Sequence, residues 1–382
     1  MYIDIHALLN VPPSNINRDD TGSPKTAIYG GALRARVSSQ AWKRAMRKLF
    51  PELLPEGSLG VRTKKAVSLL ANCIAAKRED LAEYAEKLAV AMLGAAGLKV
   101  VSSKRSGEDE GSMVTEYLVF IAEAELDALA DIAIAWADDG ADLSKKTLSA
   151  PSGVKKQVSA AFHGVQAVDI ALFGRMLANA PDLNTDASAQ VAHAISVDRI
   201  SQEYDYFTAV DDCAPEDNAG AGMIGTVGFN SSTLYRYATV NLDSLYGQLG
   251  SAVAAAAGVS AFVEAFVRSM PIGKQNTFAN RTLPYAVVVE LRDDQPINAV
   301  SAFELPVRAT EGESVSEVAL KRLVARLKGI DETYGMSPLK AWSVCVDGGA
   351  PDAEIIGERT SLPGLVKGVR DEALGVLASK EE

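Results

Sequence analysis

The residues best suited to chemistry in this sequence are basic, and they lie close together near its start. Lys43 and Arg47 are four residues apart, as are Arg44 and Lys48. On a helix the members of each pair would be neighbours, and their like charges would cost about 0.2–0.5 kcal/mol per pair in an isolated helix. We interpret this segment as a track for phosphate groups. The alternative is a solvated helix face that acidic residues elsewhere neutralise.

The charge distribution supports a local phosphate track on an acidic protein. The formal net charge is −11, whereas nucleic-acid binding needs a positive surface. Residues 21–51 contain seven basic residues and no acidic one: Lys25, Arg34, Arg36, Lys43, Arg44, Arg47 and Lys48. This stretch carries +7, so the remainder carries −18 (−11 minus +7). Arg34, Arg36, Ser38 and Gln40 enter the same element as additional hydrogen-bond donors.

Catalytic chemistry has weaker support. Asp19 and Asp20 are adjacent carboxylates that a metal-dependent nuclease could use, but adjacent acids in a proline-bearing loop are more typical of turns. His6, His163 and His193 lack metal-ligand spacing. A general base at His6 for RNA cleavage is the alternative that stays open. We therefore predict no catalytic residue, no metal and no cofactor.

Glycine-containing loops are a further place where the backbone could approach a ligand. Gly220, Gly222 and Gly225 fit the pattern GxGxxG, but they lie between an acidic loop and a strand pattern, which indicates a hairpin tip and not a dinucleotide loop. Residues 173–176 and 272–281 combine glycine with basic neighbours, which favour phosphate. Ordinary surface turns are the alternative for both.

The elements that must position these residues predict an α+β fold. Residues 2–9 alternate like a half-buried strand. A helix is expected from Ser38 or Ser39 to Phe50, ended by Pro51. Residues 60–147 are mainly helical in pattern and indicate an insertion. Strand patterns then return at 165–174, 190–200, 231–242, 284–292 and 340–348, with helices expected near 260–270, 314–330 and 363–378.

Composition excludes several classes of protein. With 48% hydrophobic and 23% charged residues, the chain is not of the disordered type. The longest apolar run, near 252–267, is broken by polar residues and is too short a pattern for a membrane span. The start lacks the pattern of a secretory signal. We expect a cytoplasmic protein with no membrane partner.

Six segments carry a resemblance to a known family: 17–48, 168–176, 192–196, 205–212, 229–242 and 273–279. In this order they resemble the backbone subunit of the type I-E CRISPR surveillance complex Cascade, the CasC family. The similarity runs from the first strand to about residue 300. It is poor in the helical insertion and in the C-terminal tail.

The resemblance implies a hand-shaped subunit. Its palm would carry a modified RNA-recognition-motif (ferredoxin-like) sheet, with a helical fingers insertion and a thumb hairpin. The expected boundaries are palm 1–50, fingers 51–149, palm 150–195, thumb 196–232, palm 233–345 and C-terminal segment 346–382.

The resemblance also implies a non-catalytic function in antiviral defence. Copies of such a subunit stack head to tail along the CRISPR RNA, and other Cascade subunits cap the ends. The RNA is held by phosphates and sugars, which leaves its bases free to pair with target DNA. The alternative is an endoribonuclease of the RAMP superfamily that processes guide RNA or cuts target RNA.

The family motif carries over onto named residues of this sequence. Expected along the RNA backbone are Arg18, Lys25, Ser38, Gln40, Lys43, Arg47, Lys274 and Gln275. Met176 would be an apolar wedge at a kink, and Phe207 and Thr208 would lie near a nucleotide displaced by the thumb.

Overall fold

The computed structural model describes residues 1–103, 110–177, 179–210, 221–346 and 356–380. It divides into two compact units. Unit 1 comprises Met1–Phe50, Ala189–Leu242 and Val259–Ser379, and unit 2 comprises Pro51–Ser188, Asp243–Gly258 and Lys380–Glu382. The expected start of the fingers at residue 51 coincides with the start of unit 2. Unit 2 also contains residues 151–188 of the expected palm segment 150–195.

Unit 1 is built on a mixed, mostly antiparallel sheet that has ten strands among the described residues. The main order is β14-β13-β12-β1-β11-β9-β3-β2, and β8 and β10 also pair with β11. Among the described strands, β13 and β14 form the one parallel pair. The strands are β1 (Tyr2–Ser14), β2 (Thr26–Tyr29), β3 (Ala32–Val37), β8 (Ala189–Val191), β9 (Ala194–Ser196), β10 (Glu203–Val210), β11 (Ala221–Asn241), β12 (Ala286–Arg292), β13 (Lys340–Cys345) and β14 (Glu358–Arg359).

Strand β1 is central and buried on both faces, where we expected one polar face. It pairs with β11 on one side and β12 on the other. Leu9 packs in a cluster with Trp42, and Leu8 packs in another cluster with Leu323 of α10 (Val315–Tyr334). Even His6 is fully buried. The alternation of polar residues was misleading because Asp4 and His6 find hydrogen-bond partners in the interior, the hydroxyls of Tyr237 and Tyr235 of β11.

Helix α1 (Ser39–Leu53) forms where the apolar stripe predicted a helix, and it buries Trp42, Met46, Leu49 and Phe50. Pro51 lies inside its last turn and does not end it. Because proline has no backbone N–H, Pro51 removes one i→i−4 hydrogen bond of this helix, which continues for two more residues.

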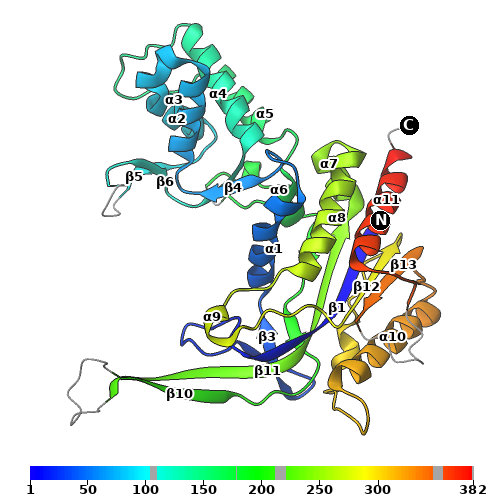
Figure 1. Cartoon of the computed structure of the whole chain (residues 1–382). Coiled ribbons are helices and arrows are strands. Elements are labelled where there is room, and N and C mark those ends of the chain that lie inside the picture. Colours follow the sequence, from blue (N-terminus) through cyan, green and yellow to red (C-terminus); the bar gives the residue numbers. More distant parts are fainter. Residues whose placement is uncertain (104–109, 178, 211–220, 347–355, 381–382) are drawn as a thin grey trace. The chain divides into compact units, whose positions relative to one another are not determined.

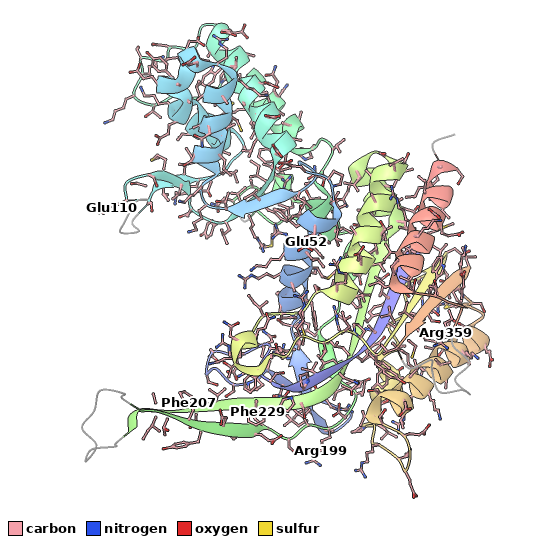
Figure 2. The ribbon with its side chains drawn as sticks, in the orientation of Figure 1. Glu52, Glu110, Arg199, Phe207, Phe229 and Arg359 are labelled. Atoms are coloured by element: carbon pink, nitrogen blue, oxygen red, sulfur yellow. The ribbon has the colours of Figure 1, made fainter. Side chains whose placement is uncertain are left out.

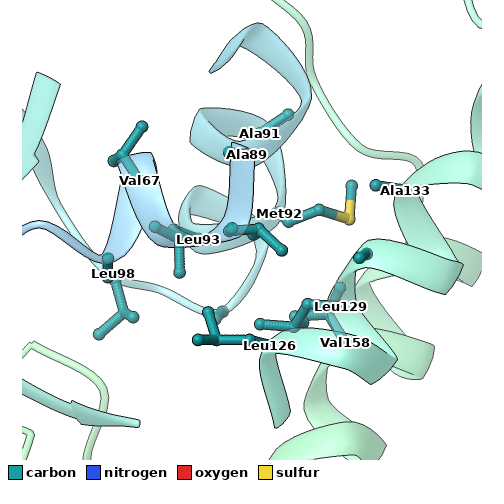
Figure 3. Packing of buried hydrophobic residues seen from close by; sticks show 14 of the residues in the cluster. Val67, Ala89, Ala91, Met92, Leu93, Leu98, Leu126, Leu129, Ala133 and Val158 are labelled. Atoms are coloured by element: carbon teal, nitrogen blue, oxygen red, sulfur yellow. The ribbon is translucent and has the colours of Figure 1, made fainter. Parts of the chain in front are cut away.

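Unit 2 contains the expected helical insertion. Its helices include α2 (Ala66–Lys77), α3 (Ala85–Ala95), α4 (Glu123–Asp138) and α5 (Ser152–Phe162). Their apolar side chains meet in one cluster, in which Met92 and Leu93 of α3 face Leu129 of α4 and Val158 of α5 (Figure 3). Two small antiparallel pairs accompany them, β4 (Gly60–Thr63) with β7 (Val119–Ala122) and β5 (Val100–Ser102) with β6 (Met113–Thr115).

The strand expected at 165–174 is wrong. Val168–Phe173 forms helix α6, and most of its side chains are buried. A short, continuous apolar run fits a buried strand or a buried helix equally well, so periodicity could not decide. The strands predicted at 231–242, 284–292 and 340–348 correspond to β11, β12 and β13.

The remaining elements of the described chain are α7 (Leu242–Leu249), α8 (Ala252–Arg268), α9 (Gln275–Phe278), α11 (Leu362–Ala378), and the short 3-10 helices at Glu79–Tyr84, Pro181–Leu183 and Ala299–Phe303. None of the described helices is long and apolar enough to span a bilayer. Strands β10 and β11 form a hairpin that extends away from the sheet (Figure 1). The tip expected at Gly220 lies outside the described residues, whereas Gly222 and Gly225 lie within β11.

Candidate nucleic-acid interface

The loop after β1 is organised around Asn17. Its side-chain Oδ1 accepts a hydrogen bond of 2.8 Å from the backbone N–H of Ser38, and its carbonyl accepts one of 2.9 Å from the N–H of Lys25. The carbonyl of Lys25 in turn accepts from the N–H of Arg36. The loop, β3 and the start of α1 are therefore tied to one point, and exposed Arg18 follows directly after it.

A second asparagine joins the loop to the hairpin. Asn15 Nδ2 donates to the carbonyls of Gly22 and Gly228, both at 2.9 Å. Asp19 closes the turn that runs from Asp19 to Ser23. Its Oδ1 accepts a hydrogen bond of 2.7 Å from the Thr21 hydroxyl and one of 2.9 Å from the N–H of Ser23. These hydrogen bonds, that of Thr21 foremost, lower the pKa of the Asp19 carboxyl. Asp19 thus forms a turn, as the alternative to a nuclease site predicts.

The loop at 272–281 lies against the same segment. A Cβ at Gly273 would lie 2.3 Å from the carbonyl oxygen of Ile16, so only glycine permits this approach. The next residue, Lys274, has a left-handed backbone with φ of 50°. Lys274 and Gln275, both half-buried, are thereby placed beside the loop that carries Arg18.

Helix α1 continues the basic surface beyond this point. Gln40, Arg44 and Lys48 are exposed, and Lys43 and Arg47 are half-buried. Burial lowers the pKa of the Lys43 ammonium group. The helix therefore presents cations at two degrees of exposure.

The side of α1 that faces the sheet packs against a buried arginine, Arg236. The Arg236 guanidinium of β11 is fully buried, with its centre 3.6 Å from the Trp42 ring centroid and 4.2 Å from that of Phe266. Its three nitrogens have no hydrogen-bond partner among the described residues. Burial lowers the pKa of Arg236 to about 9. Contact with two aromatic faces offsets part of the desolvation cost.

Two expected donors are used by the fold. Ser38 is buried, and its Oγ accepts a hydrogen bond of 3.4 Å from the N–H of Ala41, so it caps α1. Arg34 is fully buried, and its guanidinium donates to the carbonyls of Ser196 and Val197 at 2.9 and 2.8 Å, among others. Arg34 is thus unable to reach a phosphate.

Arg175, a basic neighbour of Gly174, is also buried and does not serve a phosphate. Its Nη1 lies 2.6 Å from Glu125 Oε1, with both side chains inside unit 2. Desolvation raises the pKa of Glu125 despite this arginine. The pair belongs to the core of unit 2.

One pair of basic residues was not predicted as a site. Arg36 Nη1 lies 3.2 Å from His193 Nδ1, and Arg36 Nε donates to the carbonyl of Thr26 at 3.1 Å. Burial, then Arg36 and Lys25, lower the pKa of His193. The pairing of β3 with β9 brings these residues together, and neither segment alone carries a pattern that would reveal it.

The remaining predicted residues lie elsewhere. Phe207 faces Gly225 across the hairpin, where its ring occupies the space that a side chain at position 225 would need. It lies farther from the sheet than Phe229 (Figure 2). Thr208 is exposed beside it, and Met176, in unit 2, is 81% exposed.

The structure thus brings eight predicted residues into one part of unit 1: Arg18, Lys25, Ser38, Gln40, Lys43, Arg47, Lys274 and Gln275. Ser38 is buried, and we call the other seven residues the basic cluster.

His6 is poorly placed for catalysis. Its ring is fully buried, with Nδ1 2.9 Å from the Tyr235 hydroxyl and Nε2 3.6 Å from Glu290 Oε2. Within the described ranges, no group of three or more His, Cys, Asp or Glu residues is arranged to hold a metal ion.

The protein is similar to a chain of a structure titled "CRISPR RNA-guided surveillance complex, pre-nicking", with 34% identity, a TM-score of 0.83, and coverage of 98% of this chain and 100% of that one. A chain of another, titled "CRISPR RNA-guided surveillance complex", is 29% identical with a TM-score of 0.73, covering 97% and 100%. No curated protein matches. A family model described as CT1975-like protein matches residues 3–367, so the chain belongs to the family of CT1975-like proteins.

Proposed function

We propose that this protein is a CRISPR RNA-binding backbone subunit of a type I-E Cascade complex in the cytoplasm. The observation that carries the proposal is the basic cluster. The loop with Arg18 and Lys25 is hydrogen-bonded through Asn17 to the start of α1, the loop with Lys274 lies against it, and Lys43 and Arg47 follow on α1. The likeness to chains from RNA-guided surveillance complexes supports the same function.

The chemistry of the cluster favours recognition of the RNA backbone. Lysine and arginine bind phosphates without regard to base sequence. A subunit that grips only phosphates and sugars leaves the bases free to pair with target DNA. One protein can then serve any guide sequence in antiviral defence.

The hairpin and Met176 would shape the bound RNA. Phe207 and Thr208 would meet a displaced nucleotide, and Met176 would act as an apolar wedge, because inserted apolar side chains kink nucleic acid. The exposure of Met176 and Thr208 makes both accessible for such contacts.

Assembly into a head-to-tail filament, capped by other Cascade subunits, is part of the proposal. The edge strand β2 exposes Ile28 at 79%, and Leu305 is exposed at 74%. A Cβ on Gly30 would clash with the carbonyl of Glu304, so the turn after β2 lies against the segment that carries Leu305. Exposed apolar residues at a sheet edge suit contact with another copy through a heterologous interface.

We propose further that the protein is not an enzyme. The RAMP-superfamily endoribonuclease is the rival. It would use His6 as the base or an aspartate of the expected thumb segment, Asp211, which lies outside the described residues. Burial of His6 against Tyr235 weighs against the first version.

The test is to purify the full chain from cells, with and without RNase treatment, and to sequence the RNA that accompanies it. Discrete, guide-sized RNA that stays intact during incubation is the expected result. Cleavage that is lost in His6→Asn, Asp19→Asn or Asp211→Asn, with binding retained, would establish the ribonuclease instead. A chain that oligomerises but binds no RNA, alone or with added guide, would reduce it to a scaffold.

A further inference from the structure

A narrow pocket lined by both apolar and polar side chains lies beside the basic cluster, where β1 ends. Ser14 of β1 pairs directly with Asn230 of β11, after an irregularity in register between Val11 and Ser14. Cross-strand partners have Cβ atoms about 4.5–5.5 Å apart, so these two side chains are neighbours. Both line the pocket, together with Lys25 and Arg36.

The two side chains in the pocket are buried and unsatisfied. Ser14 is 2% and Asn230 7% exposed, and neither Ser14 Oγ nor Asn230 Nδ2 has a hydrogen-bond partner among the described residues. A buried polar atom without a partner costs free energy, and most such atoms in folded proteins are paired. Two adjacent exceptions therefore indicate a place prepared for a polar group from outside.

The size of the pocket limits what can enter. Its free volume is about 10 Å³, close to the space of one water-sized group. A hydroxyl fits, whereas a phosphate group does not. The hydroxyl could accept from Asn230 Nδ2 and donate to Ser14 Oγ, so its donor and acceptor capacities would both be used.

Two other residues that line the pocket suit the phosphate that would lie next to that hydroxyl. Lys25 and Arg36, both half-buried, are cationic, and Arg36 is oriented by its hydrogen bonds to Thr26 and His193. The two cations suit a phosphate, and the neutral polar atoms of Ser14 and Asn230 suit the hydroxyl of the ribose that carries it.

We propose that this pocket receives the 2′-hydroxyl of an RNA ribose, while Lys25 and Arg36 bind the adjacent phosphate. The inference rests on the proposed function and adds to it a means of choosing RNA over DNA, since the 2′-hydroxyl distinguishes the two. The basic cluster alone would bind both.

The experiment compares binding of one single-stranded sequence, made as RNA, as DNA and as 2′-O-methyl RNA, by fluorescence anisotropy with the full chain. Wild-type protein should bind the RNA most tightly. Ser14→Ala and Asn230→Ala should each weaken RNA binding about fivefold, the effect of one ordinary hydrogen bond, and leave DNA binding unchanged. Ser231→Ala, at the exposed neighbouring position on β11, is the control and should change neither.

Thermal unfolding separates binding from a structural role. Ser14→Ala removes a buried hydroxyl that lacks a partner, so its Tm without RNA should equal or exceed that of the wild type. An unchanged RNA-to-DNA preference in folded Ser14→Ala and Asn230→Ala protein that still binds RNA would overturn the pocket assignment alone. Wild-type protein that binds neither nucleic acid would overturn the proposed function itself.

Discussion

Removing Lys43 and Arg47 together tests the basic cluster most directly. The two residues lie one turn apart on α1, about 6 Å along its axis, so each can reach a separate phosphate. Each phosphate contact with a single strand contributes about 0.7 to the slope of log K against log salt. The double alanine variant should therefore reduce the magnitude of this slope by about 1.4. Between 50 and 200 mM salt, the factor by which its affinity falls should be about seven times smaller than the factor for the wild type.

The matched control is Arg44→Ala with Lys48→Ala. It removes the same charge from the same helix, taking the formal net charge from −11 to −13 (−11 minus 2) in both variants. Affinity would be measured by fluorescence anisotropy across a salt series on several RNA sequences. Lys43 and Arg47 should affect all sequences equally and affect the slope more than the control pair does. Equal slopes for the two variants would refute the assignment, because only overall charge would then matter.

Three further results are expected. Because burial lowers the pKa of Lys43, its cation is lost at a lower pH than that of an ordinary lysine, so RNA affinity should fall as the pH rises from 7 to 10, and Lys43→Arg should remove part of that fall. Arg175→Ala should lower the free energy of unfolding by about 3–5 kcal/mol in urea titrations, since it leaves Glu125 buried without its cation; a loss under about 1 kcal/mol would contradict this. Arg236→Met should cost less than about 1 kcal/mol, whereas Trp42→Ala should cost about 3–5 kcal/mol; a larger loss for Arg236→Met would mean that the cation–ring contacts dominate.

Local patterns in the sequence predicted several elements correctly. The apolar stripe at Trp42, Met46 and Leu49 predicted α1, and segments rich in β-branched and aromatic residues predicted β11, β12 and β13. These patterns succeed because side-chain periodicity follows directly from backbone geometry. The same patterns failed at 165–174, where a short apolar run suits a helix and a strand alike.

Burial was the main source of error among the polar residues. We interpreted Arg34 and Arg175 as possible phosphate ligands, but both are buried. Arg34 donates hydrogen bonds to backbone carbonyls, and Arg175 forms an ion pair with a carboxylate. Ser38 caps a helix. In each case the residue type was compatible with RNA binding, and only its neighbours in space show whether its donors are available.

The sequence alone determined that an acidic chain carries one basic stretch, that this stretch includes a helix, and that its motifs resemble an RNA-binding family. Only the tertiary structure decided which cations meet. The approach of Gly273 to Ile16 places Lys274 beside Arg18, and the register of β1 with β11 sets Ser14 against Asn230. The physical reason is that charge and periodicity are local properties of a chain, whereas burial and hydrogen-bond partners depend on segments that can lie far apart in the sequence.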